Sequence, residues 1–438
     1  MNRQEAEDYV YASYLRAERC HSYDSRDAEK RHPSLTRPLI ESLQHTPCVA
    51  VTGSKGKGSV ANMMAAILQT RHRVGLMTSP HIAAFNERFR VDGVPVSDEE
   101  FVRTVEALKP SFDRIEASLP PDVCISPMGI QAAAGLYWFN ARQTTFNVFE
   151  LGKGARYDDV NNIDAAYAVI NPIFLEHTRE LGDTLESIAE DKACIIKRGQ
   201  SAVFVARQQP AVMAVIEKAA REKGVPVRAY GRDFYADNVR FTEAGMVFDV
   251  AVGEERFPDI RVPLLGEHQA ENCALAMAVC REILPDWDLD RVRQQLARLE
   301  WPGRMEVLSR SPLMILDACI NRSSTAAVKD VLAHLGIGKC VFVVGIPDDK
   351  DYEGVVASVQ DRALATILTR SGHPHYRFTG VQKTTLQARG IPVTESASVR
   401  EAIALARQYQ APVVILGTTS VIADVKAVMA GNFNPATP

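Results

Sequence analysis

An apolar run followed at once by a glycine-rich turn constrains the fold of this chain more than any other feature. The run covers residues 48–52 (CVAVT), and the turn that overlaps it reads VTGSKGKGS over residues 51–59. Behind the turn, apolar residues recur at helical spacing at Val60, Met63, Met64 and Ile67. A strand, a loop and a helix in this order predict the opening of an α/β domain.

The residue types of this loop are suited to binding phosphate. Glycines let backbone N–H groups converge on phosphate oxygens, and the helix behind the loop offers its positive end. Lys57 adds a mobile positive charge, and Ser59 adds a hydroxyl for a metal ion or a phosphate. The standard Walker A pattern would have Gly at Val51 and Ser or Thr at Gly58, so a flexible basic turn is the alternative. The expected nucleotide-binding residues are Gly53, Ser54, Gly56, Lys57, Gly58 and Ser59.

Similar apolar runs recur along the 438 residues of the chain. Those at 145–151, 166–170 and 201–205, with helical stretches between them, are typical of a mainly parallel sheet covered on both faces. Residues 228–262 change to short strands and turns, and after the breaker-rich segment 301–304 the pattern restarts. We therefore predict an α/β protein with a P-loop-type parallel-sheet ATPase domain over 1–297 and a smaller C-terminal Rossmann-like α/β domain over 298–438.

Composition excludes several classes of protein. Lys and Arg number 50 against 54 Asp and Glu, with no basic block, so we expect no nucleic-acid partner. No apolar stretch approaches the roughly 18 residues of a membrane span, and the N-terminus MNRQEAEDYV is not a secretory signal. The eight cysteines form no CxxC pair, so we expect no zinc site. We expect the cysteines to be reduced thiols. These features predict a cytoplasmic protein without membrane contact.

Seven further motifs follow the loop in order. They are TSPH at 78–81, FNER at 85–88, ELGKGARYDDVN at 150–161, EHT with LGDT within 176–184, DKA at 191–193, GEHQAEN at 266–272 and WPGR at 301–304. Together with the loop, this series resembles the folylpolyglutamate synthase/dihydrofolate synthase branch of the Mur ligase superfamily. The motifs are dense over residues 50–305 and sparse beyond.

The resemblance implies an ATP-dependent ligase that joins a carboxylate to an amine through an acyl phosphate. The expected substrates are a small carboxylic acid and an amino acid such as glutamate, and the expected cofactors are ATP and two Mg²⁺ ions. It assigns metal ligands at Ser79, Glu150, His177 and Lys192, and catalytic roles at Lys57, Glu150, His177 and Lys192. Lys192 matches a lysine that is carbamylated in the superfamily. By analogy with the folate branch, we expect a monomer.

Further roles implied by the resemblance concern the nucleotide and the amino acid. Asn272 is expected near the adenine, Arg304 near the phosphates, Asp317 at the ribose and Lys350 near the incoming amino acid. Each side chain taken alone has an ordinary structural explanation. His177 could cap a helix or lie in the core, Glu150 could be solvated and Lys192 could be a surface charge.

The chain departs from the family pattern at three places. Ile320 and Arg322 replace a histidine and a proline, and residues 126–131 (SPMGIQ) replace an aromatic and acidic stretch that shapes the acceptor pocket in relatives. Glu176 replaces an Asp and Asp191 replaces a Glu. These changes suggest retained ATP machinery with a diverged pocket, and therefore a non-folate acceptor. A degenerate nucleotide-binding homologue without turnover is the alternative, followed by a simple NTPase or kinase.

Overall fold

The computed structural model describes residues 1–21, 25–242, 244–372 and 377–431. The chain divides into two compact units. The first comprises Met1–Asp237, Asp249–Ile260 and Glu271–Ala297, and the second comprises Asn238–Phe248, Arg261–Ala270 and Arg298–Pro438. None of the described helices has the length and apolar character needed to cross a bilayer.

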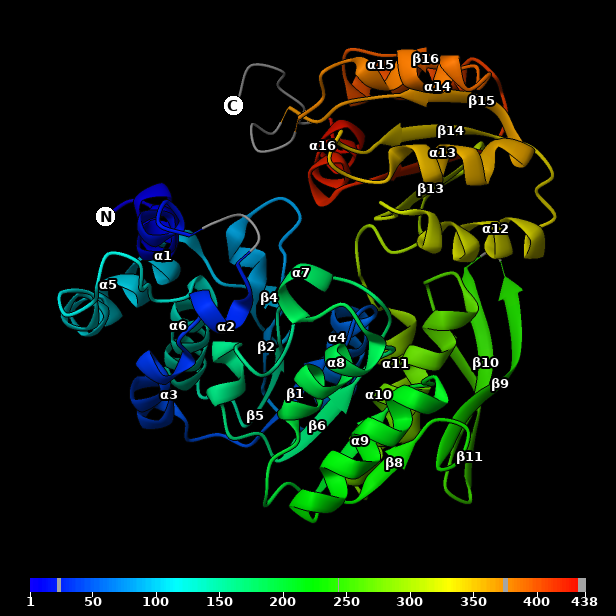
Figure 1. The fold of residues 1–438 in the computed structure, drawn as a ribbon. Helices are drawn as coiled ribbons and strands as arrows, with labels where there is room; N and C mark the ends of the chain where they lie inside the picture. The colour runs from blue at the N-terminus through cyan, green and yellow to red at the C-terminus, as the bar shows by residue number, and fades with distance from the viewer. Residues whose placement is uncertain (22–24, 243, 373–376, 432–438) are drawn as a thin grey trace. The chain divides into compact units, whose positions relative to one another are not determined.

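An eight-stranded sheet forms the centre of the first unit, in the order β4-β3-β2-β5-β1-β6-β7-β8 (Figure 1). Its strands are β1 (Cys48–Thr52), β2 (Val74–Met77), β3 (Phe89–Val91), β4 (Val94–Pro95), β5 (Phe146–Glu150), β6 (Tyr167–Ile170), β7 (Ala202–Val205) and β8 (Val227–Ala229). The strands from β2 to β8 in this order pair in parallel, and β3 and β4 add an antiparallel edge. Because the central strand β1 is buried at every residue, helices must cover both faces of this sheet.

Helices lie on both sides of the sheet in Figure 1. The α-helices up to residue 297 are α1 (Arg3–Glu18), α2 (Asp27–Lys30), α3 (Arg37–Leu43), α4 (Lys57–Leu68), α5 (Asp98–Glu116), α6 (Pro127–Ala141), α7 (Thr178–Leu181), α8 (Leu185–Lys192), α9 (Pro210–Lys223), α10 (Glu267–Ile283) and α11 (Leu289–Ala297). Helix α4 contacts β1, β2, β5 and α11, while α1, α3 and α5 pack around α6. The start of α10, up to Ala270, belongs to the second unit.

The parallel register brings the loops of the first unit together. Val51 of β1 is paired with Glu150 of β5 and with Val169 of β6. Because parallel neighbours end at the same edge of a sheet, the loop after β1 meets the segments that follow β5 and β6. The glycine-rich loop, the 150–161 motif and residues 171–177 therefore share one edge.

Three strands that follow β8 in the chain form a separate sheet in the order β11-β10-β9. Its strands are β9 (Phe234–Thr242), β10 (Gly245–Val252) and β11 (Glu255–Val262). These are the strands that the change of pattern over 228–262 predicts. They read differently from the central strands because exposed residues interrupt the buried ones in β9 and β11.

The second unit contains a six-stranded sheet in the order β12-β13-β17-β14-β15-β16. The strands are β12 (Glu306–Arg310), β13 (Leu313–Asp317), β14 (Cys340–Gly345), β15 (Ala363–Leu368), β16 (Thr394–Glu395) and β17 (Val413–Gly417). The helices are α12 (Thr325–His334), α13 (Tyr352–Val359), α14 (Val381–Ala388), α15 (Val399–Arg407) and α16 (Thr419–Met429). Only the β12–β13 pair is antiparallel among the pairings of the described strands of this sheet. The predicted α/β fold class is confirmed.

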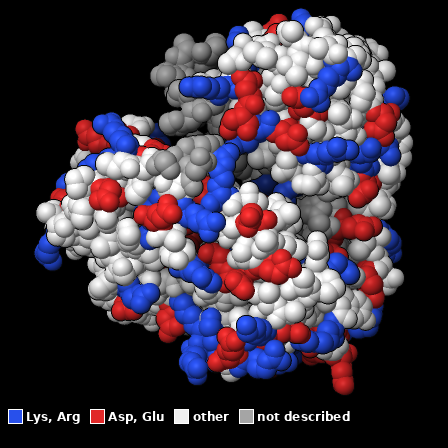
Figure 2. Space-filling model, in the orientation of Figure 1, with Lys and Arg blue, Asp and Glu red and all other residues white. Residues whose placement is uncertain are grey.

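Basic and acidic side chains are interspersed over the face drawn in Figure 2. The sequence contains 50 basic and 54 acidic residues, and on this face the two kinds are also mixed in space. Such mixing gives no extended field of one sign.

Candidate nucleotide and catalytic site

The glycine-rich loop runs from the end of β1 into α4 with two glycines at positive φ. Gly53 has φ +138° and Gly56 has φ +81°, values that L side chains rarely adopt. Gly56 is the N-cap residue of α4, so Gly58 and the buried Ser59 lie in the first turn of that helix. The Lys57 Nζ donates to the Gly53 carbonyl at 3.0 Å, which folds the lysine over the loop. The predicted strand, loop and helix are all present.

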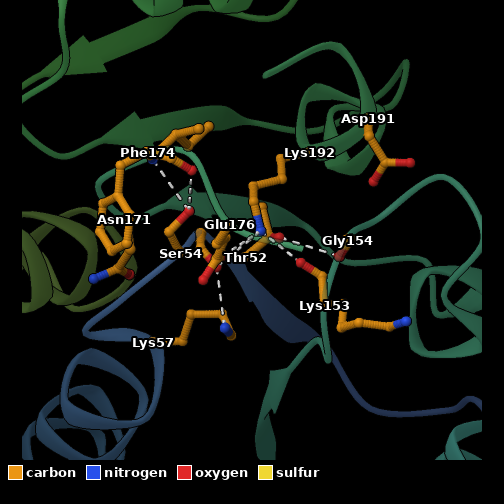
Figure 3. Close-up of polar contacts among 12 residues, drawn as sticks. Thr52, Ser54, Lys57, Lys153, Gly154, Asn171, Phe174, Glu176, Asp191 and Lys192 are labelled. Carbon is orange, nitrogen blue, oxygen red and sulfur yellow. Dashed lines mark hydrogen bonds and ion pairs between the residues drawn. The ribbon is translucent and has the colours of Figure 1, made fainter. Parts of the chain in front are cut away.

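The segment after β6 holds the loop from one side. The Ser54 backbone N–H donates to the Pro172 carbonyl at 2.9 Å. The Ser54 hydroxyl donates to the Phe174 carbonyl at 3.3 Å and accepts from the Phe174 N–H at 3.2 Å, as Figure 3 shows for the side chain. Ser54 therefore makes three hydrogen bonds to residues 172 and 174. These bonds fix its position in the loop, and its part in nucleotide binding stays a prediction.

Two asparagines pack against the loop glycines. A Cβ on Gly53 would lie 2.5 Å from the Asn171 Cβ, and one on Gly56 would lie 2.8 Å from the Asn272 Oδ1. The Asn171 Nδ2 donates to the Asn272 Oδ1 at 3.4 Å. The structure thus brings the predicted Asn272 to the loop. Sequence reasoning missed Asn171, although its position directly after β6 places it at the same sheet edge.

Lys192 is the last residue of α8, and its side chain has 0% exposure, so the alternative of a surface charge is wrong. Its Nζ donates to the Gly53 carbonyl at 3.1 Å, to the Lys153 carbonyl at 2.5 Å and to the Glu176 Oε1 at 3.2 Å (Figure 3). Burial, with a smaller effect of the Lys57 charge, lowers the pKa of Lys192 to about 8. Sequence reasoning named Glu176 only as a departure and missed its contact with Lys192.

Glu150 ends β5 and is buried, so the alternative of a solvated carboxylate is wrong as well. Its Oε2 accepts from the Ser79 backbone N–H at 2.9 Å. The structure therefore brings together two of the predicted metal ligands. The loop that carries Ser79 is itself ordered by Glu87, whose carboxylate accepts from the backbone N–H groups of Ile82, Ala83 and Ala84.

Arg88 joins the TSPH and FNER motifs to the stretch that departs from the family. Its Nε donates to the His81 Nδ1 at 2.9 Å, and its NH1 donates to the Gln131 Oε1 at 2.8 Å. Burial lowers the pKa of Arg88. The divergent stretch 126–131 therefore forms the start of α6, where Gln131 contacts the buried Arg88 guanidinium group.

His177 precedes α7 at its N-cap position with φ +47°. Burial lowers the pKa of His177, and the Glu176 carboxylate opposes that effect. Within the described ranges, no three or more His, Cys, Asp and Glu side chains converge as a metal-binding group. Mg²⁺, however, is commonly held by one or two carboxylates together with substrate phosphates and water, and Glu150 beside the loop suits that arrangement.

The remaining predicted residues belong to the second unit. Asp317 ends β13, and its Oδ2 accepts from the Met305 N–H at 2.9 Å, next to Arg304 in the chain. Lys350 pairs with Asp349 at 3.1 Å. The backbone N–H of Arg322 donates to the Asp351 Oδ2 at 2.8 Å, which fixes the segment that carries Ile320 and Arg322.

Residues 117–280 match the Mur ligase middle domain. The chain is 32% identical over 345 residues to the folylpolyglutamate synthase of Lacticaseibacillus casei, covering 78% of this chain and 79% of that protein. It is 31% identical over 387 residues to the dihydrofolate synthase/folylpolyglutamate synthase of Mycobacterium tuberculosis, covering 83% and 79%. The chain belongs to the folylpolyglutamate synthase/dihydrofolate synthase family.

Solved structures of the family agree with this assignment. The folylpolyglutamate synthase of Mycobacterium tuberculosis complexed with ADP and AMPPCP matches with a TM-score of 0.85 at 27% identity, covering 96% of this chain and 99% of that chain. An FPGS–AMPPCP–folate complex matches with a TM-score of 0.81 at 26% identity, covering 98% and 100%. Members of the family are ATP-dependent ligases that form amide bonds, and the predicted class of enzyme and its binding of ATP are confirmed.

Proposed function

We propose that this protein uses Mg-ATP to attach glutamate to the carboxylate of a folate or of a dihydropteroate-type acid. The observation that carries the proposal is the loop at 53–59, with Lys57 over the loop, Asn272 against Gly56 and Glu150 on the neighbouring strand. The relatives named for folylpolyglutamate and dihydrofolate synthesis support the choice of acceptor.

In the proposed reaction, an oxygen of the acceptor carboxylate attacks the γ-phosphorus of ATP. The bond from this phosphorus to the β,γ-bridging oxygen breaks, so ADP leaves and an acyl phosphate forms. The deprotonated amine of glutamate then attacks the acyl carbon, and inorganic phosphate leaves as the amide forms. Free carboxylates resist attack by amines, so the phosphoryl group supplies the leaving group that the second step needs.

The residues of the chain act by positioning and by charge. The helix N-terminus behind the loop and the Lys57 ammonium group bind phosphate oxygens as negative charge moves onto the leaving ADP. Glu150, with Ser79 beside it, is the proposed binding position for Mg²⁺, and His177 is the proposed ligand of a second ion. When bound, Mg²⁺ would neutralise charge on the phosphates. Asn272 is proposed to contact the adenine, Arg304 the phosphates, Asp317 the ribose and Lys350 the amino acid.

A second candidate function keeps the ligase chemistry and changes the acceptor to another carboxylic acid. The specific observation is at Gly129, in the divergent stretch: a Cβ there would lie 2.5 Å from the Asp159 Oδ1 and 2.7 Å from the Thr36 Cγ2. A larger residue at position 129 does not fit beside the buried Asp159 carboxylate. An aromatic or acidic side chain is therefore excluded at position 129, which motivates a test with acids other than folates.

Product analysis by mass spectrometry tests both candidates. The full chain is incubated with Mg-ATP, glutamate and either dihydropteroate or tetrahydrofolate, and ADP is measured in parallel. A folate product carrying one more glutamate supports the proposal. ADP release that depends on another carboxylic acid supports the second candidate. Bound ATP with no acceptor-dependent ADP from any acid tested would favour the degenerate homologue. The monomeric state and the cytoplasmic location stay predictions.

A further inference from the structure

Arg88 carries a buried positive charge that the surrounding protein uses only in part. The residue is 8% exposed, and its guanidinium carbon lies 4.9 Å from the centroid of the Phe85 ring. Its Nε donates to the His81 Nδ1 at 2.9 Å, and its NH1 donates to the Gln131 Oε1 at 2.8 Å. None of these three neighbours is a carboxylate.

Three N–H donors of this guanidinium group have no hydrogen-bond partner in the part of the chain that the structure describes. The group has five N–H donors in all, and its two hydrogen bonds use one on Nε and one on NH1. No described residue accepts from NH2 or forms an ion pair with Arg88. The three remaining donors, two on NH2 and one on NH1, lie in one plane. Such a planar fork matches the two oxygen atoms of a carboxylate.

Arg16 of α1 shows how an arginine with a structural role is bound in the same unit. Its Nε donates to the Glu116 carboxylate at 2.8 Å, its NH1 to the Pro121 carbonyl at 2.8 Å and its NH2 to the Val123 carbonyl at 2.7 Å. Each nitrogen of that guanidinium group has an acceptor, and the charge has a counter-ion. Arg88 is buried more deeply and lacks both. A buried cation without a counter-ion is unfavourable, and an anionic ligand would supply the missing charge.

The backbone places Arg88 beside the proposed binding position for Mg²⁺. The Arg88 carbonyl accepts from the Thr78 N–H at 2.9 Å, and the next residue, Ser79, donates its N–H to the Glu150 Oε2 at 2.9 Å. Burial lowers the pKa of Arg88, and the Glu150 carboxylate is among the groups that oppose this effect. The carboxylate that attacks the γ-phosphorus must lie close to the metal-bound phosphate. It must therefore also lie close to this loop.

Arg88 also contacts the stretch that we expect to line the acceptor pocket. Gln131 belongs to the divergent residues 126–131 at the start of α6. Met128 of the same stretch lies next to Gly152, because a Cβ on that glycine would be 3.9 Å from the Met128 Cε. Gly152 follows Glu150 by two residues. The divergent stretch and the proposed metal position are therefore adjacent, and Arg88 makes hydrogen bonds to the segments that carry them.

We propose that Arg88 binds the reacting carboxylate of the acceptor acid through NH2 and the second N–H of NH1. The proposal rests on the proposed function and deepens it, because it assigns the residue that recognises the acid group. Gln131 fixes the plane of the guanidinium group and leaves its charge to the substrate.

This contact gives Arg88 a part in both steps of the reaction. One carboxylate oxygen attacks the γ-phosphorus, while the other stays on Arg88 and becomes the carbonyl oxygen of the acyl phosphate. When the amine of glutamate attacks the acyl carbon, the π electrons of the C=O bond move onto this oxygen. They return to the bond as inorganic phosphate leaves. A guanidinium group fixed at this atom stabilises the negative charge that it carries in between.

The first test observes Arg88 by nitrogen-15 NMR of the arginine side chains in the full-length protein with Mg-AMPPCP. Acetate is the probe, because it carries a carboxylate and no other part of an acceptor. The guanidinium signals that are absent from Arg88→Lys should shift saturably with acetate and not with sodium chloride. Signals that respond to neither salt, or equally to both, would overturn the proposal. The result requires no turnover, so it stands even if the protein does not attach glutamate to folates.

The second test adds a competing carboxylate beside Arg88 and keeps the arginine. Gln131→Glu is assayed by ADP release with Mg-ATP, glutamate and either dihydropteroate or tetrahydrofolate. KM for the acid should rise at least about tenfold with little change in KM for ATP, because the new carboxylate neutralises the guanidinium charge. Gln131→Met is the matched control: it removes the hydrogen bond without adding a charge, so its effect should be smaller. Equal effects of the two variants, or a rise in KM for glutamate in place of the acid, would overturn the proposal.

Removing the guanidinium group completes the series. Arg88→Gln should lower kcat/KM for the acid at least about 100-fold, and Arg88→Lys, which keeps the charge and loses the fork, should lower it less. An unchanged kcat/KM for the acid in Arg88→Gln would overturn the proposal. Circular dichroism checks that the variants fold, and if Arg88→Gln does not, Gln131→Glu decides. A wild-type protein that glutamylates neither acid refutes the proposed function, whereas the acetate titration still decides the role of Arg88.

Discussion

Substituting Gly56 by Ala tests how closely the two asparagines pack against the phosphate loop. Gly56 has φ +81°, and a Cβ there would lie 2.7 Å from the Asn171 Nδ2 and 2.8 Å from the Asn272 Oδ1. Gly231 is a matched control, because its φ is +84° and a Cβ there would meet nothing within 4 Å. The two Ala variants therefore share the backbone strain and differ in the contact with the asparagines.

The expected magnitudes follow from these geometries. A left-handed conformation costs a non-glycine residue about 1–2 kcal/mol, which is the expected loss of unfolding free energy for Gly231→Ala. Gly56→Ala adds an overpacking penalty of about 1–3 kcal/mol, because Asn171 is fully buried and Asn272 nearly so. The variant should also weaken ATP binding at least about tenfold, equivalent to about 1.4 kcal/mol, because the new methyl group displaces the loop or Asn272.

Urea unfolding in a Trp301→Phe background measures the first quantity. Of the three tryptophans, Trp138 and Trp287 lie in the first unit and Trp301 lies in the second, so fluorescence then reports on the unit that holds both glycines. Isothermal titration with ATP measures the second quantity. Equal loss of stability in the two variants, or equal affinity for ATP, would refute the argument that the asparagine pair supports the loop.

Three further predictions concern charge. Lys57→Ala should lower kcat for ADP formation by at least about 100-fold, while alanine at the exposed Lys218 of α9 should leave it unchanged; comparable rates would remove Lys57 from the site. Glu150→Gln should raise the Mg²⁺ concentration for half-maximal activity on the order of 10-fold, and an unchanged Mg²⁺ requirement would contradict its place at the metal. Burial raises the pKa of Asp159 from 3.8 to about 6, so the folded state takes up a proton first as pH falls, and the contribution of this carboxyl group to stability rises between pH 6 and 4. Relative to Asp159→Asn, the wild-type protein should therefore gain about 2 kcal/mol from pH 8 to pH 4 in urea unfolding, and a constant difference would show that the carboxyl is not perturbed.

Local patterns predicted the parts of the fold that depend on neighbouring residues. The run at 48–52 and the helical spacing after it predicted β1, the loop and α4. Both signals, an apolar strand buried on both faces and the helical periodicity, lie within a few consecutive residues. The motif series placed Glu150 and Asn272 at the site. Their arrangement follows from the order of parallel strands, which brings the ends of β1, β5 and β6 to one edge.

The environment of Lys192 could not be predicted in this way. Its three acceptors come from residues 53, 153 and 176, which are distant in the sequence and meet only in the folded chain. A lysine at the end of a short helix gives no sign of burial in the sequence. The same holds for Asn171, whose partners are Gly53, Gly56 and Asn272. Contacts between distant segments define the site, and the sequence specifies them only through the complete fold.

The way the phosphate loop is supported explains why small exchanges of side chains matter at this site. A loop that binds phosphate must keep its shape before ATP arrives, because ordering it during the reaction would raise the barrier. In this protein Ser54 attaches the loop to residues 172–174 by hydrogen bonds. The Lys57 and Lys192 ammonium groups both bind the Gly53 carbonyl of the loop. A buried cation in such a support needs a carboxylate of the right length. The Glu176 carboxylate reaches the Lys192 Nζ at 3.2 Å, so shortening this side chain by one methylene would weaken or remove the contact.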